Sequence, residues 1–231
     1  MRTSTQRHSV TLPSSYSAPS AHLVPKGGWN VACPIIGVPG TGKSTLALLR
    51  IHADRAACGG QLYAIAHDNN WKLPERFPNG APTGIIRHES VAAAAARIAK
   101  DPSGIHCISA FNADDVIGFA VSIGRKSIEL HGGDKGVPVD LLLDEMAEVG
   151  GGGPNYLSPG MKQAFSGRRH CNLGIYLLAQ DPAMMNRQLL AFPTEICAFR
   201  ITDDVALERL RRTRFPPAML AALPTLPDYQ Y

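Results

Sequence analysis

The sequence predicts one α/β domain of three layers, in which helices cover both faces of a mostly parallel central sheet. Strand-like apolar runs alternate with helix-like segments from about residue 29 onward, and this order is typical of parallel strands joined by crossover helices. Several runs are apolar at consecutive positions, as expected of strands buried on both faces. With 231 residues, the chain is long enough for one such domain and too short for two.

The expected elements follow from these patterns. We expect strands near residues 30–37, 61–67, 104–109, 137–144, 174–180 and 194–200, and a further short strand at 84–88. We expect helices near residues 43–57, 89–100, 113–131, 158–170, 183–191 and 203–213.

Both ends of the chain differ from this core in composition. Residues 1–28 are rich in Ser, Thr and Pro, so they are predicted to form an extended tail or strap. Residues 29–215 are predicted to form the folded domain, and residues 216–231 a Pro-rich tail with a short helix.

Composition sets limits on location and partners. The net charge of +4 and pI near 8.9 permit a polyanionic partner without requiring one. No stretch is long and apolar enough to span a bilayer, and the first residues do not resemble a secretion signal, so we expect a soluble intracellular protein. The five cysteines are far apart in the sequence, which predicts buried free thiols and gives no sign of a zinc site.

The segment Gly37–Ser44 matches the phosphate-binding pattern G-x-x-x-x-G-K-[ST]. Such a loop binds phosphates through backbone N–H groups at a helix N-terminus, and an apolar run before it and a helical segment after it supply that context. Lys43 is expected to contact the β- and γ-phosphates of ATP, and Ser44 to bind Mg²⁺. The residues expected to contact the nucleotide are Gly37, Val38, Pro39, Gly40, Thr41, Gly42, Lys43, Ser44 and Thr45.

An acid pair, Asp144 and Glu145, follows the apolar run that begins at Val137. The carboxyl ends of parallel strands form the ligand-binding edge of such sheets. Asp144 is therefore expected to hold Mg²⁺ together with Ser44, and Glu145 to act as the base for the attacking water. Asp140 is a competing acid near the start of the strand, and Glu148 is a weaker alternative base.

The next strand also ends in a polar residue, Gln180, which we expect to sense the γ-phosphate or the lytic water. Gly167-Arg168-Arg169-His170 precedes this strand, and Phe199-Arg200-Ile201 ends the following one. This layout over residues 30–213 resembles the FtsK-HerA superfamily, and most of all the genome-packaging ATPases of tectivirus-type, membrane-containing double-stranded DNA viruses. Asp181 departs from the pattern, since relatives often carry Arg there.

The resemblance implies a RecA-like P-loop NTPase of the additional-strand, catalytic-glutamate class. It also implies an ATPase that assembles into a homo-oligomeric ring, a hexamer, and translocates double-stranded DNA into a capsid, with portal-vertex proteins as further partners. An arginine then acts on the neighbouring subunit's nucleotide; Arg168 or Arg169 matches the family position, and Arg200 is the next candidate. The location implied is the host cytoplasm, or the packaging vertex of the particle.

Other interpretations stay open at this point. The glycine-rich loop at 150–156 and Lys162 could contact DNA, or the loop could be a solvent loop without a partner. Arg209, Arg211, Arg212 and Arg214 could line a channel or an interface. Alternative functions are another FtsK-HerA-type ATPase in DNA transfer or phage assembly and secretion, a small-molecule kinase, and a nucleotide-gated scaffold without turnover.

Overall fold

The computed structural model describes residues 29–68, 72–110, 112–132, 136–145, 156–213 and 215–227. Its centre is a seven-stranded sheet in the order β3-β4-β2-β5-β6-β1-β7, and every pair of neighbouring strands is parallel. The strands are β1 (Ala32–Ile36), β2 (Tyr63–His67), β3 (Ile85–His88), β4 (Ile105–Ile108), β5 (Val139–Leu143), β6 (Leu173–Ala179) and β7 (Cys197–Ala198). The predicted α/β fold is confirmed, and the sheet is parallel across all described strands.

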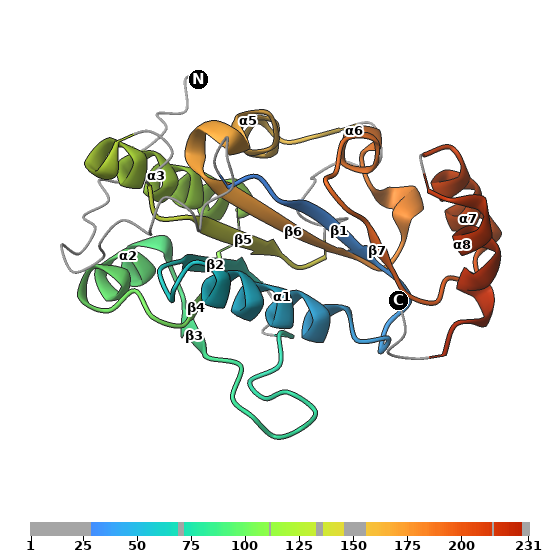
Figure 1. Ribbon diagram of the computed structural model, residues 1–231, viewed down its shortest axis with the longest axis horizontal. Coiled ribbons are helices and arrows are strands. Elements are labelled where there is room, and N and C mark those ends of the chain that lie inside the picture. Colours follow the sequence, from blue (N-terminus) through green and yellow to red (C-terminus); the bar gives the residue numbers. More distant parts are fainter. Residues whose placement is uncertain are drawn as a thin grey trace.

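Helices cover both faces of the sheet, as Figure 1 shows. One face packs against α1 (Lys43–Ala57), and the other against α2 (Val91–Lys100), α3 (Ala113–His131) and α5 (Pro159–Gly167). Neighbouring residues of β5 point to opposite faces, so Leu142 joins the core beneath α1 while Leu141 and Leu143 join the core beneath α3. This two-sided burial explains why the strands are apolar at consecutive positions.

The strand order positions the candidate site. The phosphate-loop strand β1 and the acid-pair strand β5 are not neighbours, because β6 lies between them and pairs with both. This inserted strand is the additional strand of the predicted fold class. The carboxyl ends of all three strands meet at one edge, and each is followed by a predicted site residue.

The expected strand at 194–200 is wrong in extent, since β7 comprises only Cys197 and Ala198. The backbone N–H groups of Thr194 and Glu195 both donate to the carbonyl of Ala32, at 2.9 and 3.3 Å. Two donors on one acceptor do not fit the even spacing of a parallel ladder, so the regular pairing begins only later in the segment.

Two expected helices are interrupted. The helix predicted at 158–170 continues after α5 as a tighter turn, η2 (Arg168–Cys171), and the one at 183–191 divides into η3 (Pro182–Met184) and α6 (Arg187–Ala191). Asn186 explains the second break, because it is extended and its side chain caps α6 by accepting from the backbone N–H of Gln188 at 2.9 Å.

The chain ends with α7 (Asp204–Arg211), α8 (Pro217–Ala222) and η4 (Leu223–Thr225). Leu220 and Leu223 are buried in the main core.

The predicted tail at residues 1–28 lies outside the described residues, and the domain boundaries stay a prediction. All five cysteines are free and buried, as expected. Within the described residues, none of the helices combines the length and apolar character that a membrane crossing requires.

Candidate nucleotide-binding site

The phosphate-binding loop leaves β1 and enters α1, as the sequence predicts. The backbone N–H of Gly37 donates to the carbonyl of Ala179 at 3.1 Å, and that of Val38 to the carbonyl of Arg200 at 3.2 Å. The start of the loop is therefore attached to the end of β6 on one side and to the segment after β7 on the other.

Position 37 must be glycine because Phe199 packs too closely against it to leave room for a side chain. The φ of Gly37 is 156°, and a Cβ atom added there would lie 2.6 Å from the Cβ of Phe199. Later in the loop, Gly40 and Gly42 have φ angles of 79° and 101°, in the left-handed region that favours glycine. The loop conformation thus depends on glycine for two different reasons.

We therefore expect Gly37→Ala to weaken nucleotide binding and to lower the free energy of unfolding by about 1–3 kcal/mol, because the new methyl group overlaps Phe199. The matched control is Gly60→Ala, since Gly60 also has a positive φ, of 84°, but an added Cβ would have no atom within 4 Å. Urea unfolding and titration with a fluorescent ATP analogue measure both quantities. Equal losses in the two variants would show that backbone strain, and not the contact with Phe199, sets the effect.

Lys43 begins α1 and extends back over the loop. Its Nζ atom donates to the carbonyl oxygens of Gly37 and Val38 at 2.7 and 2.9 Å. Burial lowers the pKa of Lys43, while Asp144 and Glu145 oppose this shift. A partly buried ammonium held by neutral carbonyls beside a helix N-terminus fits a polyphosphate ligand.

The acid pair follows β5 directly. The backbone N–H of Asp144 donates to the carbonyl of His67, at the end of β2, at 3.1 Å. Burial raises the pKa of Asp144 to about 6, with further contributions from the negative charges of Asp68 and Glu145. Asp68 and Glu145 are thus close enough to Asp144 for their charges to act on it, and the carboxylate oxygens of Asp144 are of the kind that a hard divalent cation such as Mg²⁺ accepts as ligands.

Glu145 is held from two sides. Its Oε1 atom accepts from Nε2 of Gln180 at 2.8 Å and from Nζ of Lys72 at 2.7 Å. Its φ of 50° is in the left-handed region, which is uncommon for a non-glycine residue and occurs often at functional positions. The contact with Gln180 connects the expected base directly to the expected sensor.

These side chains surround one cavity of about 160 Å³ at the carboxyl edge of the sheet. Its lining comprises Pro39, Gly40, Lys43, Ser44, Lys72, Asp144, Glu145, Leu178, Ala179 and Gln180. The structure therefore brings together the loop, the acid pair and Gln180. The nucleotide-contacting and catalytic roles given to these residues stay predictions.

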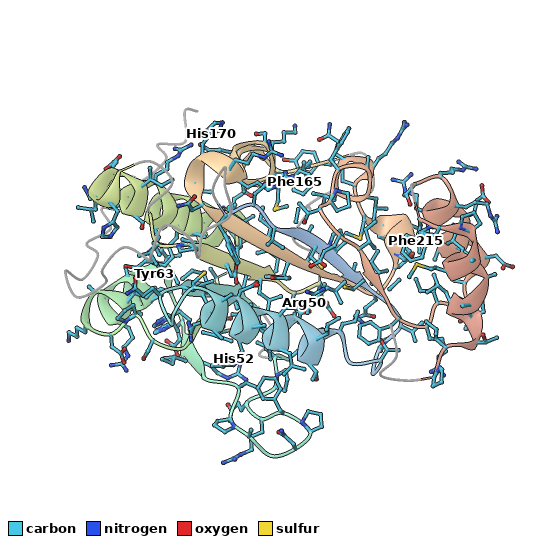
Figure 2. All side chains as sticks on the ribbon, viewed as in Figure 1. Arg50, His52, Tyr63, Phe165, His170 and Phe215 are labelled. Atoms are coloured by element: carbon cyan, nitrogen blue, oxygen red, sulfur yellow. The ribbon has the colours of Figure 1, made fainter. Side chains whose placement is uncertain are left out.

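The candidate arginines lie in two different places. Arg168 and Arg169 precede β6, whereas Gln180 follows it, so the length of β6, about 20 Å, separates them from the phosphate loop of their own chain. They line a separate cavity of about 720 Å³ together with Lys162, Phe165 and Phe192. Figure 2 shows the neighbouring His170 and Phe165 on the side of the sheet opposite α1 and Arg50.

Arg200, in contrast, lies beside the phosphate loop of its own chain, since its carbonyl accepts from Val38. Its backbone is thus next to the loop of its own chain, and its role stays a prediction. Arg168 and Arg169 are too far from their own loop for a role within the same subunit.

Asp140, the competing acid, is fully buried and lies away from the loop edge. It accepts a hydrogen bond from Nε1 of Trp29 at 2.8 Å, and burial and the neighbouring Asp54 raise its pKa well above the usual range. Asp140 is therefore a core residue and takes no part in the loop edge. Glu148, the weaker alternative base, lies outside the described residues.

The candidate DNA contacts are only partly described. The glycine-rich segment 150–155 and Arg214 lie outside the described residues. Lys162 is exposed, with its ammonium group 6.0 Å from the ring centroid of Tyr156. Arg211 and Arg212 both form ion pairs with Glu208 on the same helix, which reduces the net positive charge of that cluster.

Three residues of the cavity lining, Lys72, Leu178 and Ala179, were not predicted as site residues, and neither was Asp68, whose charge acts on Asp144. Asp68 follows β2, so the rule that polar residues gather at strand ends applied to it and could have identified it. Lys72 lies in no recognisable pattern, and only the folded chain places its ammonium group against Glu145.

No protein-family model and no curated protein sequence matches this chain. Among solved structures, the chain is similar to the genome packaging NTPase B204 from Sulfolobus turreted icosahedral virus 2 in complex with ATP-gammaS, with a TM-score of 0.63 and 14% identity over 87% of this chain and 89% of that one. The complex of the same NTPase with AMPPCP gives a TM-score of 0.61 at 14% identity, covering 87% of this chain and 89% of that one.

B204, the DNA-packaging ATPase from Sulfolobus turreted icosahedral virus, gives a TM-score of 0.57 at 15% identity, covering 85% of this chain and 88% of that one. The similarity extends over most of both chains. This agrees with the resemblance inferred from the motifs: the chain has the three-layer, all-parallel fold of the viral genome-packaging ATPases.

Proposed function

We propose that this protein hydrolyses ATP with Mg²⁺ at the cavity between the phosphate loop and the acid pair. The observation that carries the proposal is the convergence of Lys43, Asp144 and the Glu145–Gln180 pair on one cavity at the carboxyl edge. Lys43 and the backbone N–H groups of the loop bind the phosphates, and Ser44 and Asp144 hold the metal ion. Mg²⁺ supplies charge neutralisation of the transferring phosphoryl group.

In this proposal Glu145 orients the attacking water and takes its proton. Gln180 donates to one of the two carboxylate oxygens of Glu145, so it orients the carboxylate and lowers its basicity while the contact lasts. The γ-phosphate offers Gln180 an alternative acceptor. Nucleotide binding and release of the base are thereby linked through one side chain.

We further propose that hydrolysis drives the translocation of double-stranded DNA, as in genome packaging into a capsid. The shared fold with the B204 packaging ATPases supports this, together with the motif order from Arg168 to Arg200. The position of Arg168 and Arg169, far from their own loop, is what a ring with shared sites at subunit boundaries would need. The ring, with six subunits, would act in the host cytoplasm and at the portal vertex.

The test is ATP turnover by the purified chain with and without long duplex DNA. We expect duplex DNA to stimulate turnover several-fold at low salt, and the stimulation to decline as salt rises, because phosphate contacts release counterions. The control is Lys43→Ala, which should show no turnover in either condition. Particle mass with a non-hydrolysable ATP analogue reports whether a ring forms.

The outcomes separate the two parts of the proposal. Turnover without any DNA response across a range of salt would leave an ATPase and contradict translocation. Absence of turnover together with absence of analogue binding would contradict the ATPase assignment itself.

A further inference from the structure

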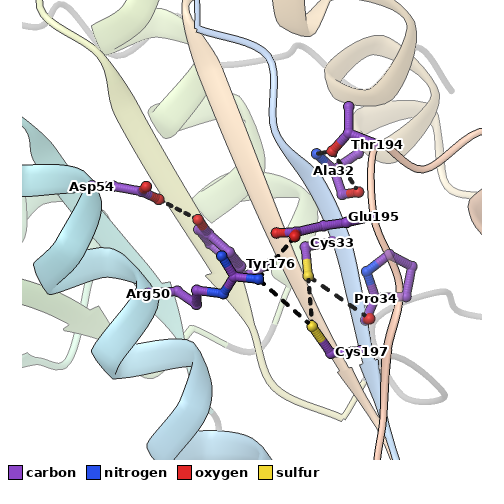
Figure 3. A network of polar contacts seen from close by, with 9 residues as sticks. All are labelled: Ala32, Cys33, Pro34, Arg50, Asp54, Tyr176, Thr194, Glu195 and Cys197. Carbon is purple, nitrogen blue, oxygen red and sulfur yellow. Dashed lines mark hydrogen bonds and ion pairs between the residues drawn. The ribbon is translucent and has the colours of Figure 1, made fainter. Parts of the chain in front are cut away.

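A cluster of potential metal ligands lies beneath α1, on β1 and the segment that contains β7. Cys33 and Cys197 have their Sγ atoms 3.8 Å apart, and the carboxylate of Glu195 lies beside them. One atom from each residue can be chosen so that all three lie within 4.8 Å of one another. Figure 3 shows the three side chains pointing toward one another, with Arg50 approaching from α1.

We propose that Cys33, Cys197 and Glu195 form a binding site for a divalent metal ion that accepts sulfur ligands, of which Zn²⁺ is the prime example. In a tetrahedral zinc site with Zn–S bonds of about 2.3 Å, two thiolate sulfurs are about 3.8 Å apart, which is the separation found here. Two thiolates and one carboxylate leave the fourth position for a water molecule.

The third ligand is held in place by backbone contacts. The N–H groups of Thr194 and Glu195 both donate to the carbonyl of Ala32, and Oγ1 of Thr194 accepts from the N–H of Ala32 at 2.9 Å. The residue bearing the carboxylate is thereby fixed against the residue that precedes Cys33. A ligand set arranged in this way loses little freedom when an ion binds.

Arg50 completes the surroundings of the site. Its guanidinium donates to Oε2 of Glu195 at 2.8 Å and lies 3.9 Å from Sγ of Cys197. Two thiolates and a carboxylate carry three negative charges, which a divalent ion and one arginine balance. Hydrogen bonds of this kind from the outer shell orient ligands in known metal sites.

The thiols are better placed to share an ion than to form a disulfide. Cys197 pairs in register with Ile35, two residues after Cys33. A strand spacing of about 4.8 Å and a two-residue rise of about 6.6 Å put the two Cα atoms about 8 Å apart, whereas disulfides rarely span more than about 7 Å.

An ion can reach the cluster from solvent, because the side chains of Arg50 and Glu195 are 39% and 37% exposed. Once bound, it would fasten β7 to β1 at the edge of the sheet. Phe199 and Arg200 follow β7 directly, and they contact the phosphate loop at Gly37 and Val38. The site would therefore stiffen one wall of the nucleotide site without taking part in its chemistry.

The test uses the full chain, kept reduced with a phosphine, freed of metal with a chelator, and titrated first with Co²⁺ and then with Zn²⁺. We expect one Co²⁺ per chain with a cobalt–thiolate charge-transfer band in the near ultraviolet, and displacement of Co²⁺ by Zn²⁺. The midpoint of thermal unfolding should rise by about 5–10 °C at a Zn²⁺ concentration of about 100 times Kd. None of these readouts depends on ATP turnover.

Cys33→Ala and Cys197→Ala should both lose the charge-transfer band, while Cys107→Ala, which removes a buried thiol from β4, should keep it. Because a core substitution can disturb folding, Glu195→Gln serves as a second variant at a partly exposed position, and it should weaken Co²⁺ binding while the circular dichroism spectrum stays unchanged. The proposal is overturned if reduced wild-type protein gives no band, if the Cys33→Ala/Cys197→Ala double variant retains it, or if Cys107→Ala loses it equally.

Discussion

Replacement of Glu145 by Gln is expected to slow ATP hydrolysis by about 10²–10⁴-fold, the contribution typical of a positioned general base, while nucleotide affinity changes little. The amide keeps the size of the side chain and can still face Gln180 and Lys72, but it cannot take a proton. Phosphate release measures turnover, and titration with a fluorescent ATP analogue measures affinity.

The control for this experiment is Glu148→Gln, which removes the other acid considered for the same role. We expect Glu148→Gln to turn over ATP at the wild-type rate. If Glu145→Gln retains full turnover, Glu145 is not the base, and a selective loss in Glu148→Gln would transfer the role to that residue.

Replacement of Arg169 by Ala is expected to lower turnover by about 10³–10⁵-fold, the range known for arginines that stabilise the charge of phosphoryl transfer. Arg169 is exposed and has no hydrogen-bond or ion-pair partner among the described residues, so its guanidinium is available to a neighbouring subunit. Mixing Arg169→Ala with Glu145→Gln subunits should restore part of the activity, because some boundaries then combine an intact Glu145 with an intact Arg169.

Arg168 provides the contrast. Its guanidinium donates to the carbonyls of Phe165 and Phe192 at 2.5 and 3.5 Å and lies over the ring of Phe165, 4.7 Å from its centroid. Arg168→Ala should therefore lower the midpoint of thermal unfolding more than Arg169→Ala does. If mixing leaves the activity of Arg169→Ala unchanged, Arg169 does not act across a subunit boundary. If mixing with Glu145→Gln subunits restores activity to Arg200→Ala, Arg200 acts across a boundary and not within its own subunit.

The regular part of the fold could be predicted because each strand is an apolar run with a clear end. The segments at 61–67, 84–88, 104–109 and 137–144 all correspond to observed strands, with boundaries that differ by at most two residues. The last third was harder, because local capping by Asn186 and the shared acceptor at Ala32 interrupt elements whose composition suggests continuity. Such interruptions depend on single hydrogen bonds, which hydrophobic patterns do not encode.

The residues of the site also fall into two groups, those that a local sequence pattern predicts and those that only the folded chain brings together. The loop and the acid pair are local patterns with a physical reason for each residue, so the sequence identified Pro39, Gly40, Lys43, Ser44, Asp144, Glu145 and Gln180 among the residues that surround the cavity. Lys72 and the Cys33–Cys197 contact depend on which segments become neighbours in space, and on the register of β7 against β1. A single sequence does not show which segments become neighbours or how two strands align. Cys33 and Cys197 are far apart in the sequence, so their contact could not be predicted.

The short strands at the two borders of the sheet have a consequence for self-association. At one border β7 presents two residues, and at the other β3 presents four. Edge strands this short are poor templates for a strand from a second molecule. Copies of this chain are therefore poorly equipped to merge their sheets into a continuous ribbon, and a contact between copies at these borders would depend on side chains.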